Sequence, residues 1–361
     1  MAEKNKTRRK VGTRRVRAAK TTIDEGEEVG KTDPAIKLSE KTIVATINWI
    51  TKTQSSGGLS EWYAKNIEKT TPAKPEAAVW ATQKDKNRIP DVPCIDDTRV
   101  KLKEIEAAKD YINANIIKAP NDRVYIATQH PLESTFADYW RMIFYEQVEN
   151  IIVLSSADEK LPDFFPMEAK KFCNHGIFFI NTRRVTERKK FEPIQYQVEV
   201  LPDGCSNSLI VNVIHYPFWP KNGVPGSTRV LMKLQGTLKT EKKITSPIVV
   251  QCSSGLNRAG SFIFTDILTD LVFKNQDPDI PNLIKKLRDQ RCQLLQNKSL
   301  FTFSCYSFTH HIRIRSNKQL PADCFKDIET FETIIVKELQ PIAAKEPPVP
   351  GAKKVATTIE E

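Results

Sequence analysis

A cysteine and an arginine separated by five residues, Cys252 and Arg258, have the types and spacing for covalent chemistry. A cysteine thiolate is a strong nucleophile, and a guanidinium forms two parallel hydrogen bonds with phosphate oxygens. A thiolate under a phosphorus atom, with an arginine on the phosphate, can accept a phosphoryl group. The spacing alone is common, and a buried cysteine near a surface arginine is the simpler interpretation. The elements around the pair decide between the two.

The residues on either side of this pair predict a strand, a polar loop and a helix. Residues 248–250 (IVV) are a short apolar run, typical of a buried strand. Apolar side chains at helical spacing follow the loop, namely Phe262, Ile263, Ile267 and Leu271. A loop at a helix N-terminus presents backbone N–H groups and the positive end of the helix dipole, which favour a phosphate and a thiolate. The context therefore favours a phosphate-binding loop.

Residues 249–262, VVQCSSGLNRAGSF, resemble the signature of tyrosine-specific protein phosphatases, which is usually close to VHCSAGxGR[TS]G. The resemblance implies that Cys252 is the nucleophile and Arg258 the phosphate clamp. It also implies a substrate-binding loop made of Ser253, Ser254, Gly255, Leu256, Asn257 and Ala259. Two residues depart from the pattern. Gln251 replaces the histidine behind the cysteine, and Ala259 replaces a hydroxyl residue that helps the thiolate leave in the family.

Residues 87–102, NRIPDVPCIDDTRVKL, resemble the family segment NRYxDVxPxDxxRVxL. By this resemblance Asp91 is the acid that holds the backbone of a bound peptide. Ile89 stands where the family has a tyrosine that forms the wall of a deep slot and stacks on the phenyl ring of the substrate. An isoleucine can still line an apolar slot, but it has no aromatic face.

Residues 110–117 (DYINANII) and 124–147 (VYIATQHPLESTFADYWRMIFYEQ) resemble two scaffold segments of the family, to which we assign no chemistry. Within them His130 replaces a glycine. A histidine in the left-handed backbone region is uncommon, so the change predicts strain if that glycine requires positive φ.

Residues 212–227, NVIHYPFWPKNGVPGS, resemble a mobile family loop, xxFHYTxWPDxGVPxS, which brings an aspartic acid to the substrate. Lys221 stands where that acid belongs. The acid protonates the leaving tyrosine oxygen, and such general acid catalysis contributes roughly 10²- to 10⁴-fold. The general acid is therefore lost at this position.

The segment from residue 284, IKKLRDQRCQLLQNKSLFTFSCYSF, resembles the family's LRxQRxxMVQTxxQYxFxY. Gln296 occupies the place of the glutamine that positions the hydrolytic water. The second glutamine of that loop is replaced by Leu300.

Lys221 and Ala259 affect turnover far more than phosphate binding, a pattern that a binding module tolerates. The first hypothesis is a catalytically impaired phosphatase-like protein that binds phosphotyrosine-containing proteins through the Cys252–Arg258 loop. A slow but genuine tyrosine phosphatase, acting through a phosphocysteine intermediate, is the second. The third is an interaction protein with a vestigial pocket. Phosphoinositide hydrolysis is disfavoured because the loop interior SSGLN has no lysine.

The resemblance implies an α/β fold, a highly twisted mixed β-sheet flanked by helices, over residues 39–315. Residues 1–38 are expected to be a disordered arm, first basic and then acidic. Residues 316–361 are expected to be a tail with a short helix and a disordered end. Nine of the first twenty residues are Lys or Arg, and the net charge is +11. The arm is a solvated tail or a contact for nucleic acid or anionic lipid.

The remaining composition points to a soluble protein of a reducing compartment. No apolar run approaches the length of a membrane span, and the basic N-terminus lacks an apolar signal core. Seven scattered cysteines without CxxC spacing argue against a disulfide framework or a structural zinc site. We expect a cytoplasmic location, with a nuclear one open through the basic arm, and neither metal nor cofactor.

Overall fold

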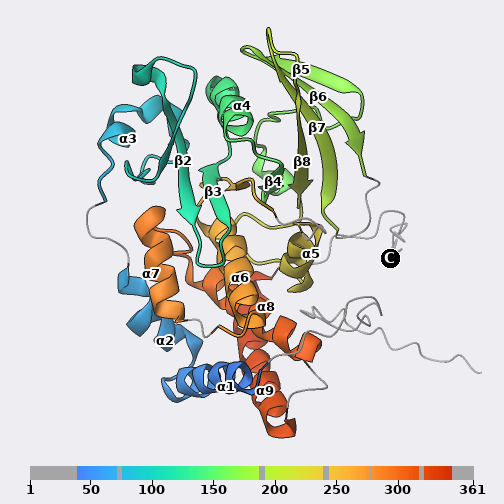
Figure 1. The fold of residues 1–361 in the computed structure, drawn as a ribbon. Coiled ribbons are helices and arrows are strands. Elements are labelled where there is room, and N and C mark those ends of the chain that lie inside the picture. Colours follow the sequence, from blue (N-terminus) through green and yellow to red (C-terminus); the bar gives the residue numbers. More distant parts are fainter. Residues whose placement is uncertain are drawn as a thin grey trace, which may run out of the picture.

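Figure 1 shows the chain as a computed structural model, which describes residues 39–70, 75–186, 192–238, 244–276, 279–316 and 321–343. The expected basic arm and the end of the expected tail lie outside these residues.

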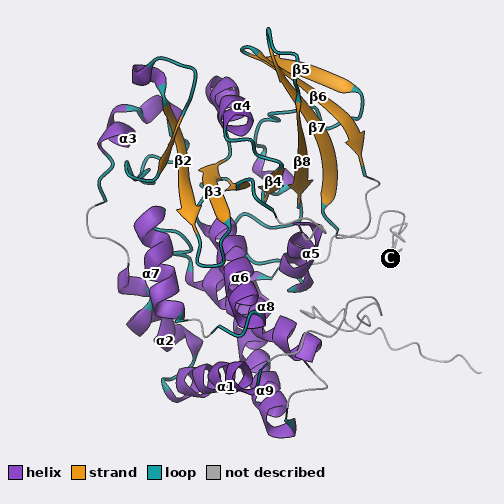
Figure 2. Cartoon of the chain, viewed as in Figure 1, coloured by secondary structure: helices purple, strands orange, loops and turns teal. Residues whose placement is uncertain are grey.

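The described residues form a nine-stranded sheet in the order β1-β2-β3-β9-β4-β8-β7-β6-β5. The strands are β1 (Arg99–Lys101), β2 (Tyr111–Lys118), β3 (Val124–Gln129), β4 (Asn150–Val153), β5 (Lys171–His175), β6 (Phe178–Val185), β7 (Ile194–Pro202), β8 (Leu209–His215) and β9 (Ile248–Cys252). The four central strands, β3, β9, β4 and β8, run parallel to one another, and the outer pairs are antiparallel. The sheet twists strongly from one edge to the other (Figure 2). This confirms the predicted twisted mixed sheet.

Helices cover both faces of the sheet. They are α1 (Glu40–Ser55), α2 (Leu59–Asn66), α3 (Ala78–Thr82), α4 (Phe136–Tyr145), α5 (Arg229–Leu238), α6 (Asn257–Phe273), α7 (Ile280–Gln290), α8 (Lys298–Ser316) and α9 (Ala322–Leu339). Short 3₁₀ turns lie between them: η1 (Glu68–Thr70), η2 (Lys84–Lys86), η3 (Ala107–Lys109), η4 (Glu133–Thr135), η5 (Ala157–Glu159) and η6 (Gln340–Ile342).

The alternation of side chains along β9 divides the core into two clusters. Ile248 and Val250 point to one face, where they pack with α5, α6, α8 and α9. Val249 points to the other face, where it packs with α4 and the inner side of β6–β8. Because side chains alternate along a strand, the apolar run 248–250 of β9 can fill both clusters at once. Burial on both faces holds β9, and the loop that follows it, at the centre of the molecule.

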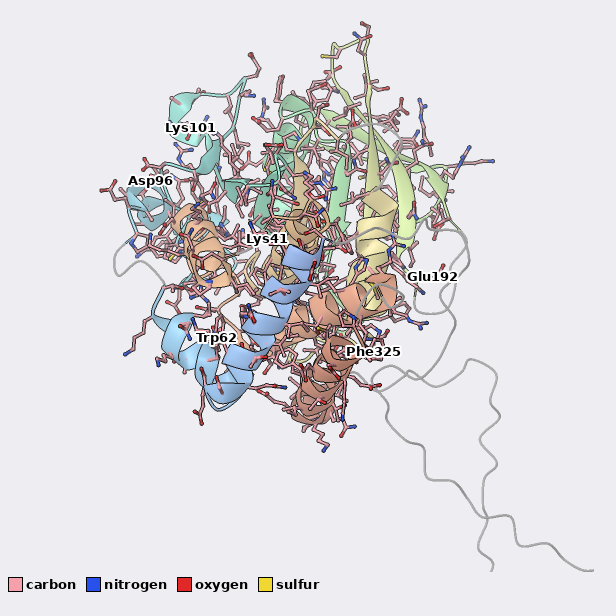
Figure 3. All side chains as sticks on the ribbon, turned by 60° about the horizontal axis from the view of Figure 1, so that its bottom comes forward. Lys41, Trp62, Asp96, Lys101, Glu192 and Phe325 are labelled. Atoms are coloured by element: carbon pink, nitrogen blue, oxygen red, sulfur yellow. The ribbon has the colours of Figure 1, made fainter. Side chains whose placement is uncertain are left out.

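The helices at the two ends of the described chain pack together below α6 (Figure 1). Phe331 of α9 meets the Trp49 ring of α1 edge-on, with 5.6 Å between centroids. Trp62 of α2, labelled in Figure 3, stacks on Phe301 of α8. The buried positions of α9 are Ile328, Phe331, Glu332, Ile335 and Leu339. Helix α9 therefore joins the same core cluster as α6 and α8.

Candidate active site

Cys252 is the last residue of β9, the strand between β3 and β4. It is 2% exposed and lies in register with Gln129, the last residue of β3. Because β3, β9 and β4 run parallel, their carboxyl ends meet at one edge of the sheet. In open α/β sheets ligands bind outside this edge. The structure thus places the predicted nucleophile at the edge of the sheet where such folds bind ligands.

The loop from Cys252 to α6 turns at Gly255, whose φ of +70° lies in the left-handed region. A Cβ on this residue would lie 2.3 Å from the carbonyl carbon of Thr128 at the end of β3. Glycine is therefore required both by the backbone conformation and by the close approach. The first turn of α6 begins two residues later, where backbone N–H groups have no partner within the helix. This is the geometry of an anion-binding loop.

Arg291, at the end of α7, supports the outer side of the loop. Its side chain is fully buried, and Nη2 donates a 3.1 Å hydrogen bond to the carbonyl of Ser254. Nη1 donates to Oδ1 of Asn115 on β2 at 2.7 Å. The guanidinium ties the loop to the sheet, so Arg291 has an architectural place rather than a chemical one.

The segment between α7 and α8 brings Gln296 beside the loop. The N–H of Leu295 donates to the carbonyl of Leu256 at 3.1 Å. The N–H of Asn297 donates to Oδ1 of Asn257 at 2.9 Å. Gln296 lies between these two anchors and is exposed. Its position next to the loop is compatible with the predicted role in orienting a water.

Arg258 forms an ion pair with Glu159 of η5. Nη2 donates to Oε2 of Glu159 at 2.7 Å, and Nη1 donates to Oε1 of the same carboxylate. Both side chains are almost fully buried, at 6% and 2% exposed. Nη1 also lies 3.4 Å from the carbonyl oxygen of Trp219, and the N–H of Ser156 donates to Glu159 Oε1. The carboxylate therefore fixes the direction of the guanidinium.

The charges of this pair stabilise each other. Burial disfavours the ionised carboxylate, but the hydrogen bonds and charge of Arg258 outweigh it and hold the pKa of Glu159 below its usual value. The nearby charge of Lys221 lowers this pKa further. Burial also disfavours the charged guanidinium, yet Glu159 raises the pKa of Arg258 above its usual value. Glu159 is thus ionised at neutral pH and cannot serve as a proton donor.

Lys221 is exposed on the loop that follows β8. The preceding Trp219 is fully buried, and its Nε1 donates to the carbonyl of Gly223 within the same loop. Ala259, in the first turn of α6, is fully buried and offers no hydroxyl to the site. The two positions at which the family pattern carries an acid and a hydroxyl therefore hold an ammonium and a methyl group.

Arg88 ties the segment that contains Ile89 and Asp91 to the sheet. The N–H of Arg88 donates to the side chain of Gln129, which is in register with Cys252. Its guanidinium donates to the carbonyl oxygens of His130 and Pro131. Ile89 is half-buried and Asp91 is exposed. The segment is thus tethered to the edge of the sheet at which Cys252 lies.

Glu159 is the residue that the sequence reasoning missed. The only local signal is Ser156 three residues before it, which forms a capping box with Glu159 around η5. That signal predicts a turn and does not identify a partner for Arg258.

Within the described ranges, no set of three or more His, Cys, Asp or Glu side chains is arranged to hold a metal ion. None of the described helices has the length and apolar character needed to cross a membrane.

A family model described as protein-tyrosine phosphatase matches residues 83–310. Mouse tyrosine-protein phosphatase non-receptor type 20 is 32% identical over 232 residues, which cover 62% of this chain and 52% of that protein. Its human counterpart is 30% identical over 263 residues, covering 71% and 60% respectively. Rat receptor-type tyrosine-protein phosphatase zeta is 30% identical over 236 residues, which cover 61% of this chain and 10% of that protein.

The chain spans less than two thirds of the length of each of these relatives. The range of the family model contains the nucleophile strand, the phosphate loop and the loop with Lys221. The family model extends from η2, before the Arg88 tether, into α8 and covers more than half of the 361 residues. This chain belongs to the protein-tyrosine phosphatase family.

Proposed function

We propose that this protein binds phosphotyrosine peptides through the Cys252–Arg258 loop and turns them over slowly or not at all. The observation that supports this proposal is a loop that keeps Cys252 and Arg258, while Lys221 and Ala259 cannot support turnover. Gly255 has the left-handed turn that the loop needs, and Arg258 is charged, buried and oriented by Glu159.

Arg258 can hold a phosphate while it remains paired with Glu159. A guanidinium has five N–H donors. Among the described residues, its contacts with Glu159 and Trp219 engage Nη1 and one hydrogen of Nη2. The Nε hydrogen and the second Nη2 hydrogen lie on one edge of the fork and suit two phosphate oxygens. Asp91 would accept hydrogen bonds from the peptide backbone, and Ile89 would line the slot for the phenyl ring.

The first chemical step lacks its proton donor. In that step the sulfur of Cys252 bonds to phosphorus while the bond from phosphorus to the tyrosine oxygen breaks. That oxygen must take a proton or leave as a phenolate, a poor leaving group because tyrosine titrates near pH ~10. Lys221 carries no carboxyl group, and Glu159 is ionised by Arg258. The loss of general acid catalysis slows this step roughly 10²- to 10⁴-fold.

The second step loses two supports. Water must attack phosphorus while the sulfur–phosphorus bond breaks and the electron pair returns to Cys252. Gln296 remains to orient the water, but Lys221 offers no base to take its proton. Ala259 offers no hydroxyl to stabilise the departing thiolate. Retention of Cys252 and Gln296 is what favours the second candidate, a slow tyrosine phosphatase.

The expected partners are phosphotyrosine-containing proteins, and the expected location is the cytoplasm. All seven cysteines are free, which fits a reducing compartment. Contact of the basic arm with nucleic acid or anionic lipid, and entry to the nucleus through that arm, remain separate expectations about residues outside the described ranges.

Turnover of a generic aryl phosphate separates the two candidates. The purified protein is compared with Cys252→Ser, which lacks the nucleophile, and with Lys221→Asp, which restores an acid. We expect the unmodified protein to stay well below about 1 s⁻¹ and Lys221→Asp to be at least ~10-fold faster. Cysteine-dependent turnover of about 1 to 10³ s⁻¹ in the unmodified protein would instead establish a working enzyme.

A further inference from the structure

Two departures from the family pattern, Gln251 and His130, touch each other behind the phosphate loop. Gln251 precedes Cys252 on β9, and His130 follows the last residue of β3. Nε2 of Gln251 lies 3.3 Å from Nδ1 of His130, and both residues are buried. In the family pattern a histidine at 251 would stand beside a glycine at 130. Here an amide stands beside an imidazole, and the imidazole comes from the neighbouring strand.

The hydrogen bonds around the pair run in one direction. The hydroxyl of Tyr139 donates to Oε1 of Gln251, which leaves the amide N–H₂ to face His130. Nε2 of His130 lies 2.8 Å from the carbonyl oxygen of Pro162. A carbonyl can only accept, so Nε2 carries the proton and Nδ1 is the acceptor for Gln251. Both ring nitrogens of His130 and both amide atoms of Gln251 therefore have a hydrogen-bonding partner.

The pair connects the elements that hold the two residues of the phosphate site. The N–H of His130 donates to the carbonyl of Cys252 at 2.8 Å. Pro162, which accepts from the His130 ring, lies three residues beyond Glu159, the partner of Arg258. Arg88 donates to the carbonyl of His130 from the opposite side. His130 is thus fixed through its N–H, its carbonyl and both ring nitrogens.

We propose that Gln251 and His130 act as one positioning unit for the phosphate loop. In this unit the imidazole that the family supplies from residue 251 is supplied from residue 130 instead. Each change compensates for the other, because each residue provides the hydrogen-bonding partner that the other requires. The inference rests on the proposed binding of phosphate by the loop.

A single reversion should therefore be worse than both together. His130→Gly removes the hydrogen-bonding partner of the buried Gln251 amide and of the Pro162 carbonyl. Gln251→His replaces the amide that faces Nδ1 of His130 with a rigid ring, which cannot keep the hydrogen bonds to Tyr139 and His130 in their present geometry. His130→Gly with Gln251→His recreates the family arrangement and removes both faults. These three variants and the unmodified protein form a double-mutant cycle.

The probe for the loop is tungstate, an oxyanion that resembles phosphate. Its affinity is measured by the protection that it gives Cys252 against alkylation by iodoacetate, with Cys252→Ser as the blank. We expect each single variant to bind tungstate about 10-fold more weakly and the double variant to recover to within about 3-fold. Thermal unfolding of the same four proteins shows which of them are folded at the assay temperature.

The results separate a positioning unit from a structural one. If the two substitutions are coupled in thermal stability but all four proteins bind tungstate equally well, the pair only supports the fold. That result would overturn the proposal. Losses that multiply in the double variant would overturn it too. Absence of tungstate binding in the unmodified protein would contradict the proposed function instead. The pairing of Gln251 with His130 would then be tested by which ring nitrogen of His130 carries the proton.

NMR of the His130 ring tests the pair without any substitution. We expect the Nε2–H form at neutral pH, and an Nδ1–H form would overturn the proposal. Gln251→Glu supplies a second test if a single variant fails to fold. A carboxylate cannot donate to Nδ1, so the ring must gain a proton and its titration must move to higher pH. The charged and titratable groups facing the ring are Arg88, His215 and Glu159. An unchanged titration in Gln251→Glu would overturn the proposal.

Discussion

Gly223, two residues after Lys221, lies directly against Ile342 at the end of the described chain. A Cβ on Gly223 would stand 2.4 Å from the carbonyl oxygen of Ile342. That oxygen accepts a 3.2 Å hydrogen bond from the N–H of Val224, and Val224 forms an isolated parallel bridge with Ala343. The segment after α9, η6 and Ala343, thus holds the loop that carries Lys221.

Replacing Gly223 by alanine is expected to push Ile342 away and break this contact. We expect the free energy of unfolding to fall by about 1–2 kcal/mol, from a strained contact and a lost hydrogen bond. Urea unfolding measures the change. Gly236→Ala is the control, because Gly236 lies in α5 with nothing within 4 Å of the added Cβ. That substitution should be neutral or stabilising. Gly223→Ala is also measured in a chain that ends at Leu339 and so lacks Ile342. If it lowers the free energy of unfolding there as much as in the full chain, the contact with Ile342 is not the cause.

The turn of the phosphate loop requires glycine at 255 both for its positive φ and for its close contact with β3. A comparison of Gly255 with Gly204 measures the two effects separately. Their φ values are similar, +70° and +74°, but only Gly255 has backbone atoms where a Cβ would be. Gly204→Ala should cost only the left-handed conformation, about 1–2 kcal/mol. Gly255→Ala should cost at least ~2 kcal/mol more, because Thr128 must also move. Equal losses of stability in urea unfolding would refute the close packing of the loop on β3.

Removal of the Glu159 charge is expected to weaken the fold and the site together. Glu159→Gln leaves Arg258 buried without a counter-charge, and breaking such a pair costs about 3–5 kcal/mol. The combined variant Glu159→Gln, Arg258→Met contains no uncompensated charge and should be more stable than Glu159→Gln alone. Chemical unfolding of the two variants measures this. A combined variant that is less stable than Glu159→Gln would show that an uncompensated Arg258 charge is not what destabilises Glu159→Gln.

The stability of the protein should fall in mild acid because of His130. Burial, the main cause, lowers the pKa of His130 to about 4, while Arg88 and His215 lower it and the Pro162 carbonyl and Glu159 raise it. An unfolded histidine titrates near pH ~6.5. The unfolded state therefore binds a proton first, and stability decreases as the pH falls from about 6.5 to about 4.

The free energy of unfolding should fall by about 3 kcal/mol in all. This follows from the fall in the pKa of His130 from 6.5 to about 4 on folding, because one pKa unit corresponds to about 1.36 kcal/mol. Urea unfolding at several pH values, compared with the variant His130→Gln, which has no imidazole at either position, isolates the share of residue 130. The same pH dependence in both proteins would contradict a neutral buried His130.

The strand, loop and helix around Cys252 could be predicted because their signals are local. An apolar run, a loop containing Gly255 and helical spacing stand within 25 consecutive residues. The pairing of Arg258 with Glu159 could not be predicted in this way, because 99 residues separate them. The same holds for Gln251 and His130, which are 121 residues apart. Each was visible as a departure, but their contact depends on how β3 and β9 pair in the sheet.

The C-terminal helix shows the same limit. The spacing of Phe331, Ile334, Ile335 and Leu339 predicts an amphipathic helix. Of these four, Ile334 is exposed in the structure. The sequence does not say what covers its apolar face, which α1 and α8 do in the fold. Nor does it show that the chain beyond this helix reaches the loop of Lys221. Long-range contacts of this kind follow from topology and not from periodicity.

The central claim is that the loop recognises a phosphotyrosine through Arg258, whether or not it turns the group over. The most direct measurement is the affinity of one tyrosine peptide, phosphorylated and unphosphorylated, for the unmodified protein and for Arg258→Met, with Arg258→Lys as the matched control. We expect the unmodified protein to prefer the phosphorylated peptide, Arg258→Met to lose that preference, and Arg258→Lys to keep part of it through its charge. An unmodified protein with no preference, or Arg258→Met with an undiminished one, would contradict the account.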